Sequence, residues 1–480
     1  MIRLPLLVLL LAAFAPAQED SRPDVLFLFA DDLRTDGVGA FGNPHVRTPA
    51  TDAIVRRGMR FDRNYCLGSM HGAACQPSRA MLMSGRTLYR VPMDLDGVPM
   101  FPEVMRGAGY RTFGTGKWHN GAAAFERAFG EADAVLLAGM SDHEKVPLRR
   151  YDENGKLGDA AVGPGFSSEL FAAAAIRFLE TTRDDARPFL CYVSFTAPHD
   201  PRQPPLEWRQ PYYDRRPPLP RNFLPQHPVD NGWMADRDER LAAWPRRVED
   251  VSDQLCEYYG LISHLDAQIG RIVAAHAALG RGRDLVLVFT SDHGLAMGSH
   301  GLLGKQNLYE HSMGCPLAIV GPGIRPGATR ALTALVDLAP TLCELTGTTA
   351  PPGMEGRSLA PILRRERKAV REDLYLTFAT GQRAVVGPRW KLIRYPLIDR
   401  EQLFDLDADP EERVDLSGDP ARADLRRELG RRLAVLHDAS GDPHPLRVAE
   451  PKSGEIDLSG RPRRPDRFQP PWIVEKYFRD

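Results

Sequence analysis

The stretch DVLFLFADD, residues 24–32, decides the fold class of this chain. An almost unbroken apolar run ends abruptly at two carboxylates, Asp31 and Asp32. Such a run predicts a strand that is buried on both faces, as in a parallel sheet between layers of helices. The two carboxylates therefore stand at the carboxyl end of a central strand.

Two later runs have the same character, residues 189–195 (FLCYVSF) and 285–290 (LVLVFT). Each is followed by polar residues, which include His199 after the first run and Asp292 and His293 after the second. Between these runs lie segments with helical apolar spacing, notably 251–279. Strands that alternate with helices predict an α/β/α sandwich with a large, mostly parallel central sheet. Because ligands bind beyond the carboxyl ends of such strands, we expect the polar clusters to converge on one crevice.

The chain divides into four predicted segments. Residues 1–17 carry one charge at Arg3 and then an apolar run, which predicts a signal peptide cleaved near Ala17 and export to the periplasm or the cell exterior. A membrane anchor is the alternative, but a span needs roughly 20 apolar residues. Residues 22–365 form the predicted larger α/β domain and 366–445 a smaller α+β domain with an antiparallel sheet. Residues 446–480 are predicted to be an irregular tail packed on the body, and the Pro-rich stretch 198–228 an irregular excursion.

Composition excludes several classes of function. The chain has 480 residues with 62 Lys and Arg against 63 Asp and Glu, so no overall field attracts nucleic acid or acidic membranes. No segment after the first residues is long and apolar enough to span a bilayer. Six cysteines are too few for a disulfide-built scaffold.

The sharpest local signal is Cys75-Gln76-Pro77-Ser78-Arg79. A cysteine just before a proline and a helical stretch predicts a helix amino terminus, where unpaired N–H groups favour anionic chemistry. The residues alone leave three interpretations open: a thiolate nucleophile with a lowered pKa, a buried structural cysteine, or a zinc site with Cys66 and His71. The irregular spacing argues against zinc.

The segment resembles the formylglycine signature of type I sulfatases, in which Cys-x-Pro-x-Arg precedes a short helix that here ends in Ser84-Gly85-Arg86. Further segments are similar to blocks of that family in the same order: Asp31-Asp32, 116–119 (GKWH), Pro198-His199, 291–294 (SDHG), 301–305 (GLLGK) and 403–411 (LFDLDADPE). Residues 31–34 resemble the iduronate-2-sulfatase-like and choline-sulfatase-like branches, and residues 305–311 are similar to choline-sulfatase-like enzymes. The resemblance implies an alkaline-phosphatase-like fold, and a sulfatase whose Cys75 is oxidised to an aldehyde by a formylglycine-generating or other maturating enzyme.

The resemblance also implies a metal ion. Carboxylate oxygens suit calcium or magnesium better than zinc, and the family favours calcium. The implied ligands are Asp31, Asp32, Asp292, His293 and an oxygen of residue 75. His293 stands where many relatives carry an amide.

Catalytic roles follow from the same resemblance. Sulfate ester cleavage places negative charge on the departing oxygen, so cations aimed at that oxygen should dominate catalysis. By this resemblance Arg79 and Lys117 surround the aldehyde hydrate and the sulfate. Lys305 and His199 lie beside the leaving oxygen, and His199 is the general acid. His119 is the base that removes a proton from the hydrate to release sulfate. Asn120 departs from the family pattern and is expected to lie outside the chemistry.

The preferred substrate is a sulfated carbohydrate. The alternatives are a phosphonate monoester or phosphodiester hydrolase that uses the same aldehyde, and a non-catalytic binder of sulfated glycans with an unconverted Cys75. Ser141-Asp142-His143 invites a catalytic-triad interpretation, which we reject because adjacent residues seldom converge on one point.

Overall fold

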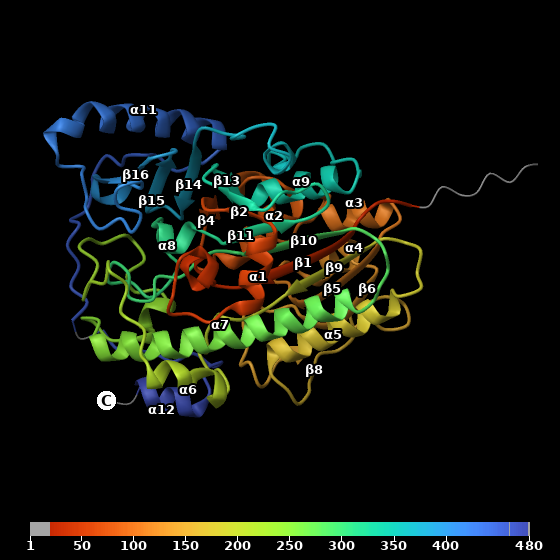
Figure 1. Cartoon of the computed structure of the whole chain (residues 1–480). Coiled ribbons are helices and arrows are strands. Elements are labelled where there is room, and N and C mark those ends of the chain that lie inside the picture. The colour runs from red at the N-terminus through yellow and green to blue at the C-terminus, as the bar shows by residue number, and fades with distance from the viewer. Residues whose placement is uncertain (1–19, 460, 479–480) are drawn as a thin grey trace, which may run out of the picture.

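The computed structural model describes residues 20–459 and 461–478, so the predicted signal peptide lies outside the described residues. Two sheets organise the chain, a large one covered by helices on both faces and a smaller one that carries α11 (Figure 1). Within the described ranges, no helix combines the length and the apolar character that a bilayer crossing needs.

The large sheet has eight strands. Five neighbouring strands, β10, β1, β9, β5 and the edge strand β6, run parallel, and on the other side of β10 the strand β11 is antiparallel. The order across the sheet is β12 (Gly327–Thr329), β2 (Met59–Phe61), β11 (Leu317–Val320), β10 (Leu285–Ser291), β1 (Asp24–Ala30), β9 (Phe189–Ser194), β5 (Arg111–Lys117) and β6 (Glu131–Leu136). The predicted α/β fold with a mostly parallel central sheet is confirmed.

Helices cover both faces of this sheet because its central strands are apolar on both sides. On β1, Val25, Phe27 and Phe29 belong to one core cluster, and the intervening Leu26 and Leu28 belong to the other. The first cluster packs under α2 (Cys75–Ser84), α3 (Phe101–Gly107), α4 (Ala122–Ala128) and α9 (Leu338–Leu345). The second packs under α1 (Pro49–Arg57), α5 (Ser167–Thr181) and α7 (Val248–Ala277) (Figure 1).

The smaller sheet has the order β17-β16-β15-β14-β4. Four of its strands are consecutive and antiparallel: β14 (Leu374–Phe378), β15 (Gln382–Val386), β16 (Trp390–Tyr395) and β17 (Arg400–Asp405). Helix α11 (Ala423–Ser440) packs Leu433 against Val385, Leu392 and Leu403. The fifth strand, β4 (Gly68–Ser69), precedes α2 in the chain and pairs parallel with β14. The segment that leads to Cys75 is therefore hydrogen-bonded to the smaller sheet.

The sequence-based expectation for residues 198–228 was wrong in one respect. This stretch contains a helix, α6 (Leu206–Asp214), with Pro205 just before it and Pro211 inside it. Packing on α7 compensates for the proline, since the Tyr212 hydroxyl lies 2.6 Å from Ser263 Oγ and Tyr213 donates to Glu257 at 2.7 Å. Tertiary contacts thus override a local helix breaker.

The remaining elements are short. They are β3 (Asn64–Tyr65), β7 (Pro147–Leu148), β8 (Ala161–Val162), β13 (Thr333–Ala334), α8 (Glu310–Met313), α10 (Ala360–Leu363) and α12 (Pro471–Phe478). Single 3-10 turns occur at Thr35–Gly37, Gly39–Phe41, Leu88–Arg90, Asp238–Leu241, Leu335–Asp337, Pro396–Ile398 and Pro420–Arg422.

Candidate active site

The carboxyl ends of four neighbouring strands carry most of the residues that the sequence singled out. Asp31 and Asp32 follow β1, and Asp292 and His293 follow β10. On the other side of β1, His199 follows β9, and β5 ends at Lys117 with His119 two residues later. Helix α2 supplies Cys75 at its first position and Arg79 one turn on, and the loop before α8 supplies Lys305. The ten predicted site residues form one connected cluster.

A group of four possible metal ligands lies at the centre of this cluster. Ligand atoms of Asp31, Cys75, Asp292 and His293 all lie within 4.8 Å of one another, and all four residues are buried. Asp32 falls instead into a second group with His199 and Asp200, although His293 Nδ1 is only 3.4 Å from Asp32 Oδ1. Neither group contains Cys66 or His71, the other two residues of the zinc interpretation.

This donor set fits a divalent cation. Within the part of the chain that the structure describes, Asp31 Oδ1 and His293 Nε2 are buried and have no hydrogen-bond partner. An unsatisfied carboxylate oxygen is costly in a protein interior, and a hard cation would satisfy it. Two carboxylates and a histidine around one point, with a third carboxylate beside them, are the arrangement that such an ion requires.

Two buried cations border the same cluster. Lys117 Nζ donates to Asp31 Oδ2, and Arg79 donates to Asp292 Oδ2 at 3.3 Å and to the Lys117 carbonyl at 2.9 Å. Burial opposes the charge on Lys117, but Asp31 and Cys75 raise its pKa above the ordinary value. Both side chains therefore stay charged at neutral pH and offer positive charge to an anionic ligand.

The Cys75 thiol lies 3.2 Å from His119 Nδ1. Burial would raise the pKa of Cys75, yet the charges of Lys117 and His119 hold it well below its usual range. Burial of Cys66 has no such compensation and raises its pKa to about 11. Position 75 is thus electronically distinct from the structural cysteine nearby, and all six cysteines, which lie in the described part of the chain, are free.

Lys305 and His199 lie on the opposite side of Asp32. Lys305 Nζ is 2.9 Å from Asp32 Oδ1 and 3.7 Å from Asp238 Oδ2, and these carboxylates outweigh the effect of burial and raise the pKa of Lys305 well above its ordinary value. His199 Nδ1 lies 2.7 Å from the Asp200 carbonyl, while its Nε2 lies 3.8 Å from Asp32 Oδ2. The Lys305 ammonium and the His199 ring thus both lie beside Asp32.

Three supporting residues were missed by sequence reasoning. His143, which belongs to the rejected triad interpretation, lies 2.9 Å from the His199 carbonyl through Nε2. Gln306 donates to the Gly72 carbonyl at 3.0 Å and to Asp238 at 2.8 Å, linking the Lys305 loop to the Cys75 loop. Asn120 donates to the Gln76 carbonyl at 3.0 Å, so it braces the Cys75 helix. Their contacts span long sequence separations, so even for Gln306, which lies in the 305–311 block, the sequence does not reveal the contact partners.

Above the cluster lies a cavity of about 390 Å³. Its lining includes Cys75, His119, His199 and Lys305. The cavity can therefore hold a ligand whose anionic group reaches the thiol, the two histidines and the lysine at once.

Two family models match this chain. The model described as Sulfatase covers residues 23–348, and the model described as N-sulphoglucosamine sulphohydrolase, C-terminal, covers residues 298–439. An N-acetylglucosamine-6-O-sulfatase of Bacteroides thetaiotaomicron is 26% identical, with 89% of this chain and 88% of the relative covered. A choline-sulfatase of Rhizobium meliloti is 28% identical, with 83% of each covered.

Solved structures share the fold. A structure described as a complex with its substrate D-glucosamine-2-N,6-O-disulfate has a TM-score of 0.74 at 22% identity and covers 88% of this chain and 99% of that one. A phosphonate monoester hydrolase of Agrobacterium radiobacter has a TM-score of 0.67 at 22% identity, with 87% and 96% covered. At these identities the likeness is one of fold.

Proposed function

The chain belongs to the formylglycine-type sulfatase family and is a sulfuric ester hydrolase, and from that premise we propose that it hydrolyses sulfate monoesters of carbohydrates through an aldehyde hydrate formed from Cys75. The observation that carries the proposal is the single pocket in which Cys75 faces His119, while His199 and Lys305 line the same cavity. The carbohydrate part rests on a relative whose name is N-acetylglucosamine-6-O-sulfatase.

Hydration of the aldehyde gives residue 75 two hydroxyls on one carbon. One hydroxyl oxygen attacks the sulfur while its proton passes to the Asp292 carboxylate, which lies within 4.8 Å of the side chain of residue 75. The bond between sulfur and the alcohol oxygen breaks, and the alcohol leaves with a proton from His199. Lys305, beside His199 in the pocket, stabilises the charge that develops on the departing oxygen. Its pKa is held high by Asp32 and Asp238 against the effect of burial, which keeps it charged.

Release of sulfate needs only the second hydroxyl. His119, 3.2 Å from the side chain of residue 75 through Nδ1, removes the proton of that hydroxyl. The carbon–oxygen bond to sulfate then breaks, the aldehyde re-forms, and water regenerates the hydrate. A serine in the same place would lack the second hydroxyl and would remain sulfated, which is the physical reason for the oxidation of Cys75.

We further propose that Asp31, Asp32, Asp292 and His293, together with an oxygen of residue 75, hold a divalent cation. The carboxylate donors suit calcium or magnesium, and the family resemblance favours calcium. Such an ion supplies a Lewis acid beside the sulfate oxygens. Arg79 and Lys117 add two buried positive charges. Cations therefore hold the three non-ester oxygens of the sulfate before the ester bond breaks. The proposal includes export after cleavage near Ala17 and oxidation of Cys75 by a maturating enzyme of the host.

The test compares p-nitrophenyl sulfate with p-nitrophenyl phosphate and a phenylphosphonate monoester, using the chain from a host that converts the cysteine. We expect a higher kcat/KM for the sulfate, and no turnover by Cys75→Ala. A higher kcat/KM for either phosphorus ester would favour the phosphonate or phosphodiester hydrolase instead. Binding of sulfated glycans without turnover, by protein that keeps a thiol at position 75, would favour the non-catalytic alternative.

A further inference from the structure

The wall of the catalytic cavity includes residues that the chemistry above does not use. Asp236, Arg467 and Phe468 line the same 390 Å³ space as Cys75 and His199. Two of them, Arg467 and Phe468, belong to the carboxy-terminal tail, far in sequence from the strands whose ends carry the site residues. The question is what this wall recognises.

The tail is fixed to the loop of the proposed general acid. Asp200, which follows His199, accepts from Arg237 Nη1 at 2.6 Å and from Gln469 Nε2 at 2.7 Å. Arg237 Nε also donates to Asp466 at 2.8 Å, one residue before Arg467. The wall residues are therefore held at a defined place relative to His199.

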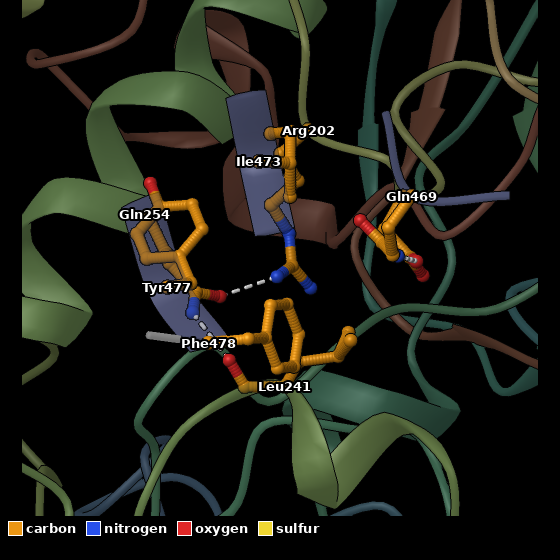
Figure 2. A pocket seen from close by; sticks show the side chains of 8 residues that line it. Arg202, Leu241, Gln254, Gln469, Ile473, Tyr477 and Phe478 are labelled. Carbon is orange, nitrogen blue, oxygen red and sulfur yellow. Dashed lines mark hydrogen bonds between the residues drawn. The ribbon is translucent and has the colours of Figure 1, made fainter. Parts of the chain in front are cut away.

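Helix α12 completes this attachment. Figure 2 shows the Arg202 side chain among Ile473, Tyr477 and Phe478 of α12, with Gln254 of α7 as its hydrogen-bond partner. Arg202 and Ile473 are buried. Because a packed helix follows it, the segment around Arg467 is not a free end.

Arg467 is a cation available to a ligand. Its side chain is exposed, and its guanidinium carbon lies 4.7 Å from the centroid of the Phe468 ring. Across residues 20–459 and 461–478, no carboxylate forms an ion pair with it, whereas Arg237 nearby pairs with Asp200, Asp238 and Asp466. Stacking on Phe468 orients the guanidinium without neutralising it.

Asp236 supplies an acceptor on the same wall. It is half-buried, and its Oδ2 would lie 3.0 Å from a Cβ placed on Gly72, so a side chain at position 72 would crowd it. Burial and the neighbouring Asp238 raise its pKa above the ordinary value. No side-chain cation of the described residues pairs with it, and besides the backbone N–H of Arg237 its carboxylate can accept from hydroxyl donors.

We propose that Asp236, Arg467 and Phe468 form a subsite for an acidic sugar, in which Arg467 binds a second anionic group, Asp236 accepts sugar hydroxyls and Phe468 packs on the ring. The inference rests on the proposed function and narrows its substrate class to glycans that carry a carboxylate or a further sulfate besides the sulfate to be cleaved. A quaternary ammonium ligand fits poorly, because the Arg467 guanidinium carries the same positive charge and repels it.

Binding is measured by calorimetry on the full chain with Cys75→Ala, which prevents turnover. The probes are N-acetylglucosamine 6-sulfate, glucosamine 2-N,6-O-disulfate, a singly sulfated disaccharide with a hexuronate, and choline sulfate. We expect about tenfold tighter binding of the probes with a second anion, the effect of one charge-assisted hydrogen bond at a partly exposed site. The disulfated and hexuronate probes separate a second sulfate from a carboxylate.

Arg467→Met should abolish this preference, and Arg464→Met, an exposed arginine of the same tail outside the cavity, should keep it. An undiminished preference in Arg467→Met, the absence of any preference in the parent, or tightest binding of choline sulfate would overturn the subsite. Failure of the proposed function looks different: the converted chain would leave p-nitrophenyl sulfate intact while the binding preference persists.

Discussion

Replacing Lys305 with methionine should slow hydrolysis most for esters whose alcohol is a poor leaving group. Lys305 Nζ is buried, 2.9 Å from Asp32 and beside His199 in the pocket. Removal of one such donor from a developing oxyanion costs roughly 10²- to 10³-fold in kcat. A nitrophenolate needs less help, so we expect about a tenfold loss or less with that leaving group, on the scale of one exposed charge interaction.

The same substitution also affects stability, and this effect must be separated from catalysis. Without Lys305, the buried carboxylates Asp32 and Asp238 lose a shared cation, at a cost of roughly 3–5 kcal/mol. Adding Asp238→Asn removes one of those charges. The double variant should therefore regain part of the lost unfolding free energy without regaining the rate for poor leaving groups.

The assay is kcat for a series of aryl sulfates whose phenols span several pKa values. The expected result is a steeper dependence of log kcat on the leaving-group pKa in Lys305→Met than in the parent. Parallel lines, with equal loss for good and poor leaving groups, would refute the assignment of Lys305 to the leaving oxygen.

Three further predictions concern the proposed metal ion, the buried carboxyl of Glu412 and the pairing of β4 with β14 at Gly68. Dialysis against a chelator should abolish sulfatase turnover and lower Tm, and calcium at about 100 times its Kd should return roughly 2.7 kcal/mol of stability; full activity without metal would contradict the ligand assignment. Burial raises the pKa of Glu412 from 4.5 to about 7, although the charge of Lys391 lowers it. The folded chain therefore binds this proton more tightly than the unfolded chain does. The free energy of unfolding should fall as pH rises from about 4.5 to 7. Glu412→Gln should flatten that fall in thermal melts, and an unchanged slope would exclude Glu412 as its source. Gly68→Ala should lower the free energy of unfolding in urea by roughly 3 kcal/mol or more, because a Cβ at position 68 would lie 1.7 Å from the Thr377 carbonyl oxygen. Gly97 also has a positive φ but faces open space, so Gly97→Ala should lower it by only about 1 kcal/mol.

Short-range patterns predicted how the candidate site residues are placed in this fold. The run at residues 24–30 became β1, with Asp31 and Asp32 beside Asp292 across the β1–β10 pair, because parallel strands bring their carboxyl ends together. Cys75 begins α2 as Pro77 indicated, and Gly85 caps it at positive φ. Each of these features is set by residues that are close in sequence or by a general rule of sheet topology.

Contacts between distant segments could not be predicted in the same way. The pairing of β4 with β14 depends on a two-residue strand with no apolar pattern, and its one clear mark is Gly68 at φ 106°. The support of His199 by His143, and the attachment of the tail through Gln469, join residues 56 and 269 positions apart. Such contacts follow from packing of the whole chain, which a single sequence does not reveal.

Mass spectrometry of the peptide that spans Cys75, from protein exported by its own host, tests the central claim most directly. The account predicts an aldehyde or its hydrate at position 75, in proportion to the sulfatase activity of the preparation. An unmodified thiol in a preparation with full activity would contradict it.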